Sequence, residues 1–259
     1  MGFFDRIFGG GQAETTVPGT KLRAEFKSAP FFKMMIDKKR STIKMYQEQN
    51  VALSQQEKFR PINNWVLAME HLDLVYINYS IGNDIGLCYN EYVTAAGYYG
   101  EGWDADAFYT DVIDMISLGS LLNVPENVFG PVINYIRQSD SGSSYPTWTS
   151  DALLWYIINA NKPGSGPQPD TLITEAYRDI YDLTKMPKAD AEREMKLYLD
   201  KWYRLHKDDS WYENHKKERS YKGYWCWESG AVTKIMGLDD SSYANHPNYP
   251  YDMVHWSAS

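Results

Sequence analysis

Cysteine is scarce in this chain, and the signals for secretion and membrane insertion are missing. The 259 residues include only two cysteines, Cys88 and Cys226, whose separation fits neither a metal-binding nor a redox motif. We therefore expect no disulfide framework and a reducing, cytoplasmic location. The N-terminus lacks the apolar run and the cleavage site of a signal peptide. No apolar run reaches the roughly 18 residues of a membrane-spanning helix, so no membrane contact is expected.

Motifs for catalysis and for cofactor binding are missing as well. There is no Walker loop, no dinucleotide-binding glycine motif and no nucleophile elbow. None of the five histidines is paired at the spacing of a zinc-binding helix. His71 lies two residues from Asp73, which is more typical of a surface helix pair than of catalysis. We expect no metal, no cofactor and no enzymatic activity.

One enzymatic alternative stays open around Glu228. This acid lies among Tyr224, Trp225 and Trp227, and apolar surroundings can raise the pKa of a carboxyl group enough to make it a general acid. With His255 further downstream, the alternative function is an uncharacterised helical enzyme with acid–base groups at these two positions. A structural interpretation is favoured, in which Glu228 is a buried acid held by a ring hydroxyl or a backbone N–H group.

Cations are absent from a long internal stretch. Residues 61–136 contain ten acids but no Lys or Arg, whereas residues 1–60 carry 11 bases and 6 acids. The field of such a stretch repels nucleic acid and attracts a basic protein, so we expect a protein partner and no nucleic acid. The other interpretation left open is a solvated acidic face that the basic first segment balances.

Within this stretch, five acids fall in 14 residues beside aromatic side chains. Acids interleaved with exposed rings are typical of a surface that binds a basic protein. The sequence therefore predicts a partner-binding surface in the 91–114 region. Its candidate residues are Glu91, Tyr98, Glu101, Trp103, Asp104, Asp106, Asp111 and Asp114.

Apolar residues recur at helical spacing through most of the chain. After Pro61, one stripe advances at steps of 4, 3, 4 and 3, through Trp65, Met69, Leu72, Tyr76 and Tyr79. No alternating apolar–polar run of useful length is present. The sequence predicts an all-α fold of about nine or ten helices packed as stacked antiparallel pairs, with no significant sheet.

Local chemistry predicts several element ends. Asp170 is expected to cap one helix and Pro187 to open the next. The last long helix is expected over 221–236, with Gly237 just after its end. Prolines predict a loop over 245–252 that packs back on that helix, with Asp252 and His255 as a possible pair.

Three parts of the chain are expected to differ in organisation. Residues 1–30 are predicted as a flexible tail, 31–140 as an N-terminal helical domain and 141–259 as a C-terminal helical domain. The boundary is placed at the polar, glycine-containing stretch 139–145, which is predicted to form a loop.

The C-terminal domain carries a distinctive set of motifs. Tyr224-Trp225-Cys226-Trp227-Glu228 is followed by Ala231-Val232-x-Lys234-Ile235-Met236-Gly237, by Asp239-Asp240-Ser241-Ser242, and by His246-Pro247-x-Tyr249-Pro250-Tyr251-Asp252. This set resembles the C-terminal signature of the PoNi immunity-protein family, and the resemblance covers the N-terminal half more loosely.

The resemblance implies an all-helical, non-enzymatic antitoxin. Its partner would be a PoNe-type DNase toxin, delivered between bacteria by secretion systems and basic around its active cleft. The signature residues Tyr224, Trp225, Trp227, Glu228, Tyr249, Pro250, Tyr251 and Asp252 are expected to maintain the fold. Because immunity surfaces diverge with their toxins, contacts with the toxin are expected outside these motifs, in the acidic 91–114 region.

Overall fold

Helices make up all the regular structure that the computed structural model describes, which comprises residues 21–101, 109–142 and 148–257. No strand occurs in these ranges, so the predicted all-α fold is confirmed. None of the helices in them combines the length and the apolarity that a bilayer crossing requires. The α-helices are α1 (Ala29–Ser54), α2 (Pro61–Ile81), α3 (Ile85–Glu101), α4 (Tyr109–Leu121), α5 (Glu126–Gly142), α6 (Ala152–Asn161), α7 (Arg178–Leu183), α8 (Lys188–Leu205), α9 (Trp227–Met236) and α10 (Tyr251–Val254).

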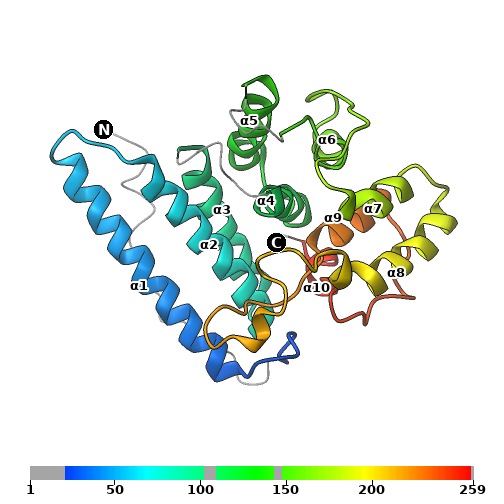
Figure 1. Ribbon diagram of the computed structural model, residues 1–259, viewed down its shortest axis with the longest axis horizontal. Helices are drawn as coiled ribbons and strands as arrows, with labels where there is room; N and C mark the ends of the chain where they lie inside the picture. Colours follow the sequence, from blue (N-terminus) through cyan, green and yellow to red (C-terminus); the bar gives the residue numbers. More distant parts are fainter. Residues whose placement is uncertain (1–20, 102–108, 143–147, 258–259) are drawn as a thin grey trace.

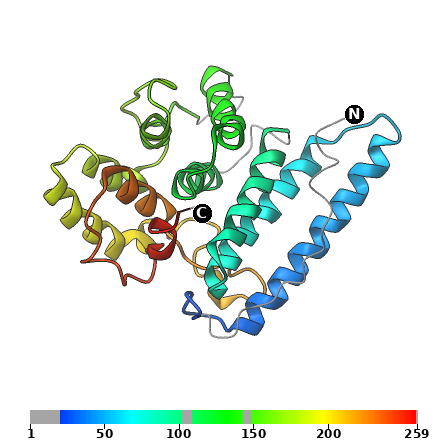
Figure 2. The same ribbon diagram turned by 180° about the vertical axis from the view of Figure 1, so that it is seen from behind.

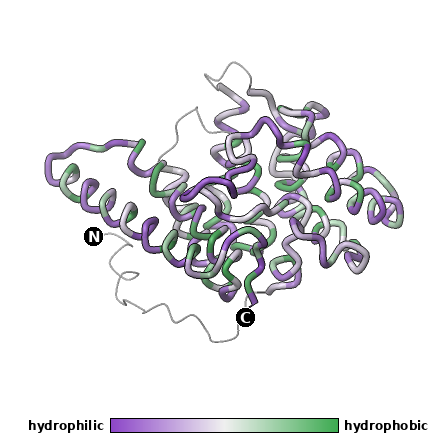
Figure 3. Tube along the Cα trace, turned by 60° about the horizontal axis from the view of Figure 1, so that its bottom comes forward, coloured by the Kyte–Doolittle hydropathy of each residue, from purple (hydrophilic) through white to green (hydrophobic). Residues whose placement is uncertain are grey.

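Three long helices form one side of the molecule, and α4 lies at its centre (Figure 1). α2 packs between α1 and α3, while α4 packs on α9 and also contacts α5 and α6. Seen from behind, α7 and α8 pair at the opposite end from α1 (Figure 2). Hydrophilic residues cover the projecting connection between α1 and α2, and hydrophobic residues gather in the middle (Figure 3). The halves on either side of α4 therefore share a continuous core.

The predicted apolar stripe of α2 faces this core. Pro61 begins the helix, where its missing N–H group costs no hydrogen bond. From Leu72 on, most side chains of α2 are buried, because α1 and α3 cover it on two sides. Gly82 ends the helix in the left-handed conformation, with a φ of 92°, and its N–H donates to the carbonyl of Tyr79.

Two predicted boundaries between α5 and α8 are wrong. α5 continues to Gly142, through part of the expected 139–145 loop, and within the helix Ser139 and Ser141 donate their hydroxyls to carbonyls one turn back. Asp170 caps no helix. Thr174 instead caps a short 3₁₀ helix, Glu175–Tyr177, that leads into α7. α8 begins directly after Pro187, as predicted.

The last long helix is shorter than predicted. α9 begins at Trp227 and residues 221–226 form no helix, although Gly237 ends the helix as expected. Gly223 has a φ of +110°, which a helix does not allow. The segment contacts α2, where Ser80 donates to the carbonyl of Lys222 at 2.6 Å and accepts from the indole of Trp225 at 2.8 Å. Contacts with α2 therefore override the helical pattern of this segment.

The residues just before α1 are held on the same part of α2. The N–H groups of Arg23 and Ala24 both donate to the carbonyl of Ser80, and Phe26 stacks on His215 with ring centroids 4.3 Å apart. Residues 21–28 are therefore part of the folded body. The rest of the predicted tail, 1–20, lies outside the described residues.

The C-terminal segment packs back on α9, but not through the predicted pair. His255 faces Asp240, with 2.8 Å between Nε2 and the carboxylate, and Tyr249 donates its hydroxyl to the same carboxylate at 2.8 Å. Asp252 instead accepts from Arg23 at 2.6 Å. The two residues therefore have different partners, Arg23 and Asp240.

Gly223, in the segment before α9, should not tolerate a side chain. A Cβ atom there would lie 2.2 Å from the Ser80 hydroxyl, in a backbone conformation that L-residues rarely adopt. Gly223→Ala should lower the free energy of unfolding by about 2–4 kcal/mol, measured by urea denaturation. Gly97→Ala is the matched control, because a Cβ there meets nothing within 4 Å in the middle of α3. That variant should be as stable as the wild type or more so. Equal stability of the two variants would contradict this account.

Candidate functional site

The cation-free stretch obtains its positive partners from other parts of the chain. Lys39 of α1 lies 2.9 Å from Glu70 and 2.7 Å from Asp73, and Lys222 lies 2.6 Å from the other oxygen of Asp73. Although burial alone would raise it, the pKa of Asp73 is lowered by the ammonium groups of Lys222 and Lys39. These acids of α2 are therefore neutralised inside the molecule, as the interpretation of a balanced acidic face expects.

Glu91 is likewise occupied within the fold. Its carboxylate is buried, accepts from Arg40 of α1, and lies 2.7 Å from Nδ1 of His71. Burial alone would raise the pKa of Glu91, but the hydrogen bond from His71 and the charge of Arg40 lower it. His71 therefore pairs with Glu91 and is buried, so the predicted surface pair with Asp73 is wrong. Residues two apart on a helix do not face each other.

The remaining candidates of the 91–114 region fall into three groups, and the third, Asp111 and Asp114, lines a pocket. Tyr98 is half-buried, stacks on His71 and accepts from Gln47 at 3.4 Å. The side chain of Glu101 and the residues Trp103, Asp104 and Asp106 lie outside the described part of the chain. The partner-binding role of this region stays a prediction.

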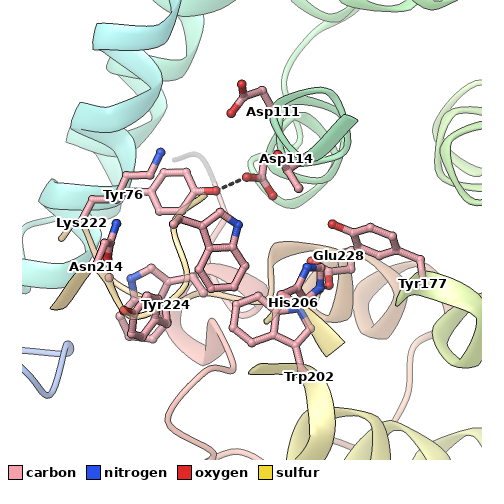
Figure 4. A pocket seen from close by; sticks show the side chains of 14 residues that line it. Tyr76, Asp111, Asp114, Tyr177, Trp202, His206, Asn214, Lys222, Tyr224 and Glu228 are labelled. Carbon is pink, nitrogen blue, oxygen red and sulfur yellow. Dashed lines mark hydrogen bonds between the residues drawn. The ribbon is translucent and has the colours of Figure 1, made fainter. Parts of the chain in front are cut away.

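The last two candidates, Asp111 and Asp114, line a pocket beside α4 (Figure 4). The opposite wall comes from the C-terminal half, including Tyr224, Trp225 and Glu228 of the signature. The pocket has a volume of about 50 Å³, far below the roughly 300–1,000 Å³ of sites for drug-sized ligands. Tertiary packing thus brings acids of the candidate surface together with signature residues that are more than 100 positions away.

Carboxyl groups outnumber ammonium groups in this pocket. Neither Asp111 nor Asp114 forms an ion pair with a described residue, and Asp114 accepts a hydrogen bond from Tyr76. Burial raises the pKa of Asp111, and the opposing effects of Lys222 and Asp73 leave it raised. Burial also raises the pKa of Asp114 well above its usual range, although the hydrogen bond from Tyr76 lowers it.

Lys222 is the cation of the pocket, and it is already engaged. Besides its contact with Asp73, its ammonium lies 4.3 Å from the centroid of the Tyr76 ring. Burial by itself would lower the pKa of Lys222, but the carboxylates of Asp73 and Asp111 raise it. Lys222 therefore stays protonated in contact with Asp73, and it acts on Asp111 and Asp114 through its charge without a direct ion pair to either.

Glu228 is a buried acid held by neutral donors. It accepts from the hydroxyl of Tyr198 at 2.9 Å and from the indole of Trp202 at 2.7 Å, and the thiol of Cys226 lies 3.1 Å away. The favoured interpretation expected a ring hydroxyl, and the Tyr198 contact fits it. His255 is paired with Asp240 and does not line the pocket. The two groups of the enzymatic alternative are thus not brought together.

Two further polar groups of the pocket were not anticipated from the sequence. His206 and Asn214 are 2% and 6% exposed, and Nε2 of the first and Oδ1 of the second have no hydrogen-bond partner among the described residues. Both lie between α8 and the 221–226 segment, a region without a motif. No signal in the sequence could have placed them beside α4.

The other signature residues divide between the core and the surface. Trp227 is fully buried against Tyr79, and Trp225 meets the same ring edge-on at 4.7 Å. Tyr249 is buried on Asp240, whereas Tyr251 is 39% exposed beside His255. Pro250 is buried and faces Gly230 of α9.

The arrangement defines an all-helical protein with a small, acceptor-rich pocket, and comparison with known proteins identifies its family. Residues 23–134 match the family model for the N-terminal part of PoNe immunity proteins (PoNi), and residues 149–253 match the model for their C-terminal part. The chain belongs to the PoNi family of immunity proteins and has the antitoxin function of that family. No curated protein and no solved structure matched the chain.

Asp114 should make the fold less stable at neutral pH than at acidic pH. Its raised pKa means that its contribution to stability is complete below the unfolded carboxyl pKa of about 4 and is lost as the pH rises through the folded value. Asp114→Asn keeps an acceptor for Tyr76 and carries no charge. It should be more stable than the wild type at pH 7.5 by on the order of 1 kcal/mol, and the difference should shrink towards pH 4.

Differential scanning calorimetry across this pH range measures the effect. Asp182→Asn is the control, because Asp182 forms a surface pair with Lys185, and this variant should follow the wild-type pH profile. A lower melting temperature for Asp114→Asn at pH 7.5 would show that the ionised carboxylate stabilises the fold.

Glu91 should be needed for folding. Glu91→Ala leaves the buried His71 and the guanidinium of Arg40 without their carboxylate, which should cost roughly 3 kcal/mol. Glu175→Ala removes an exposed ion pair with Arg178 and should leave the urea midpoint nearly unchanged. A wild-type midpoint for Glu91→Ala would exclude a structural role for this carboxylate.

Proposed function

We propose that this protein binds a cognate PoNe DNase toxin directly and neutralises it without enzymatic activity of its own, in the bacterial cytoplasm. The family match over both halves of the chain carries the proposal. A nuclease must neutralise the phosphates of its substrate, so its DNA-binding surface is basic. An acidic antitoxin with a net charge of −8 is suited to approach such a surface.

The acids that remain without a cation indicate where the toxin binds. Lys39, Lys222 and Arg40 pair with Glu70, Asp73 and Glu91, while Asp111 and Asp114 form no ion pair with a described residue. Asp104 and Asp106 precede them in the sequence. We therefore place the toxin-binding surface at α4 and the residues just before it, and not at Glu91.

Co-expression of this chain with its toxin tests the function. A stable complex that co-purifies, together with loss of plasmid degradation, is the expected result. A complex in which DNase activity persists would contradict neutralisation. Absence of both complex formation and protection of growth would overturn the proposal as a whole.

Charge reversal tests the surface. Replacing Asp104, Asp106, Asp111 and Asp114 with Lys should slow association with the toxin at least about tenfold at low salt, because steering depends on the field of these acids. Biolayer interferometry at two salt concentrations measures the rate, and the effect should shrink as salt screens the charges. Reversal of Asp179, Asp182 and Glu175 around α7 is the matched control. An unchanged association rate at low salt would place the surface elsewhere.

A further inference from the structure

The pocket beside α4 has an excess of hydrogen-bond acceptors. Asp111, Asp114 and Glu228 form no ion pair with a residue in the described ranges, and the donors that reach Asp114 and Glu228 are uncharged. The ammonium of Lys222 faces Asp73 at 2.6 Å. A ligand that fills this pocket therefore has to supply positive charge and several donors.

Two buried, unpartnered acceptors point to the same chemistry. The amide nitrogen of Asn214 donates to the carbonyl of Ser220 at 2.8 Å, which orients its Oδ1 away from that partner. Nδ1 of His206 lies 2.8 Å from the carboxylate of Asp209, and in the tautomer that donates to this carboxylate Nε2 is an acceptor. Native proteins rarely leave buried acceptors unpaired, so these two atoms are suited to accept hydrogen bonds from a ligand.

Aromatic faces complete the lining. The rings of Trp202 and Trp211 stack with centroids 5.4 Å apart and an interplanar angle of 21°, and Tyr224 lies 5.6 Å from Trp211. Cations bind favourably over such rings, and the planar guanidinium also stacks on them. The volume of about 50 Å³ is suited to one side-chain head group and not to a larger ligand.

We propose that this pocket receives the guanidinium group of an arginine side chain of the toxin. Arginine offers five N–H donors in one plane, which an ammonium group does not, and the pocket presents carboxylates, neutral acceptors and indole rings around a small space. The inference rests on the proposed function, because it names the toxin as the source of the side chain. Arginines that fill pockets of this kind are typical anchors of tight protein interfaces.

A small probe tests the pocket without the toxin. N-acetyl-L-arginine methylamide is titrated into the full-length chain while the indole N–H signals of Trp202 and Trp211 are followed by NMR. The arginine amide should shift these signals saturably. The corresponding citrulline amide has nearly the same shape but no charge, and its affinity should be at least about tenfold lower. Equal binding of the two amides, or no saturable shift with the arginine amide, overturns the proposal.

Variants connect the pocket to the toxin. Asp111→Asn/Asp114→Asn removes two charges and keeps both side-chain shapes, and Trp211→Leu removes a half-exposed ring without changing charge. Each should weaken binding of the arginine amide and should raise the Kd for the PoNe toxin about tenfold or more. Glu175→Gln, on the surface away from the pocket, is the control and should retain wild-type affinity for both.

The two proposals fail in different ways. If the wild-type chain protects cells and binds the toxin while both pocket variants bind it equally well, the arginine pocket is overturned and the immunity function stands. If the wild-type chain neither binds nor protects, the proposed function fails, and with it the toxin as the source of the side chain.

Discussion

The ion pair between Lys222 and Asp73 joins two parts of the chain that are 149 residues apart. It holds the 221–226 segment against α2. Ser80 contacts the same segment, because it donates to the carbonyl of Lys222 and accepts from the indole of Trp225. Breaking a largely buried pair of this kind is costly, because the partner that remains keeps its desolvation penalty. The position of α9, and so the wall of the pocket opposite α4, depends on this contact.

The same contact explains how a stretch without cations can fold. Four carboxylates or more within one packed region would repel one another, and desolvation would add to that cost. Lys39 and Arg40 reach Glu70, Asp73 and Glu91 from α1, and Lys222 reaches Asp73 from the C-terminal half. Asp114 has no such ion pair with a described residue, and burial raises its pKa. The proposed role of α4 in toxin binding therefore opposes its stability, because ionised acids that would attract a basic partner destabilise the free protein.

Local patterns were sufficient for most of the helices. Pro61, Pro187 and Gly237 act on the backbone of their own neighbourhood, so their effects were predicted correctly from the sequence. The start of α9 was predicted wrongly. The sequence pattern of residues 221–226 is helical, but contacts with Ser80 hold this segment in a non-helical conformation. Likewise, Asp252 and His255 are close in sequence, but Arg23 and Asp240 are their partners in space.

The candidate site shows the same division. The family resemblance and the acidity of α4 can be read from the sequence, because both depend on residue identity alone. Which acids are neutralised is decided by tertiary structure, since Lys39, Arg40 and Lys222 come from segments outside the acidic stretch. Likewise, only the tertiary structure places the acceptors of His206 and Asn214 in one pocket with Asp111 and Asp114. The sequence by itself determined an all-helical, acidic protein of the PoNi family. Only the tertiary structure decided which of its charges remain available to a partner, because electrostatic compensation acts through distance in space and not along the chain.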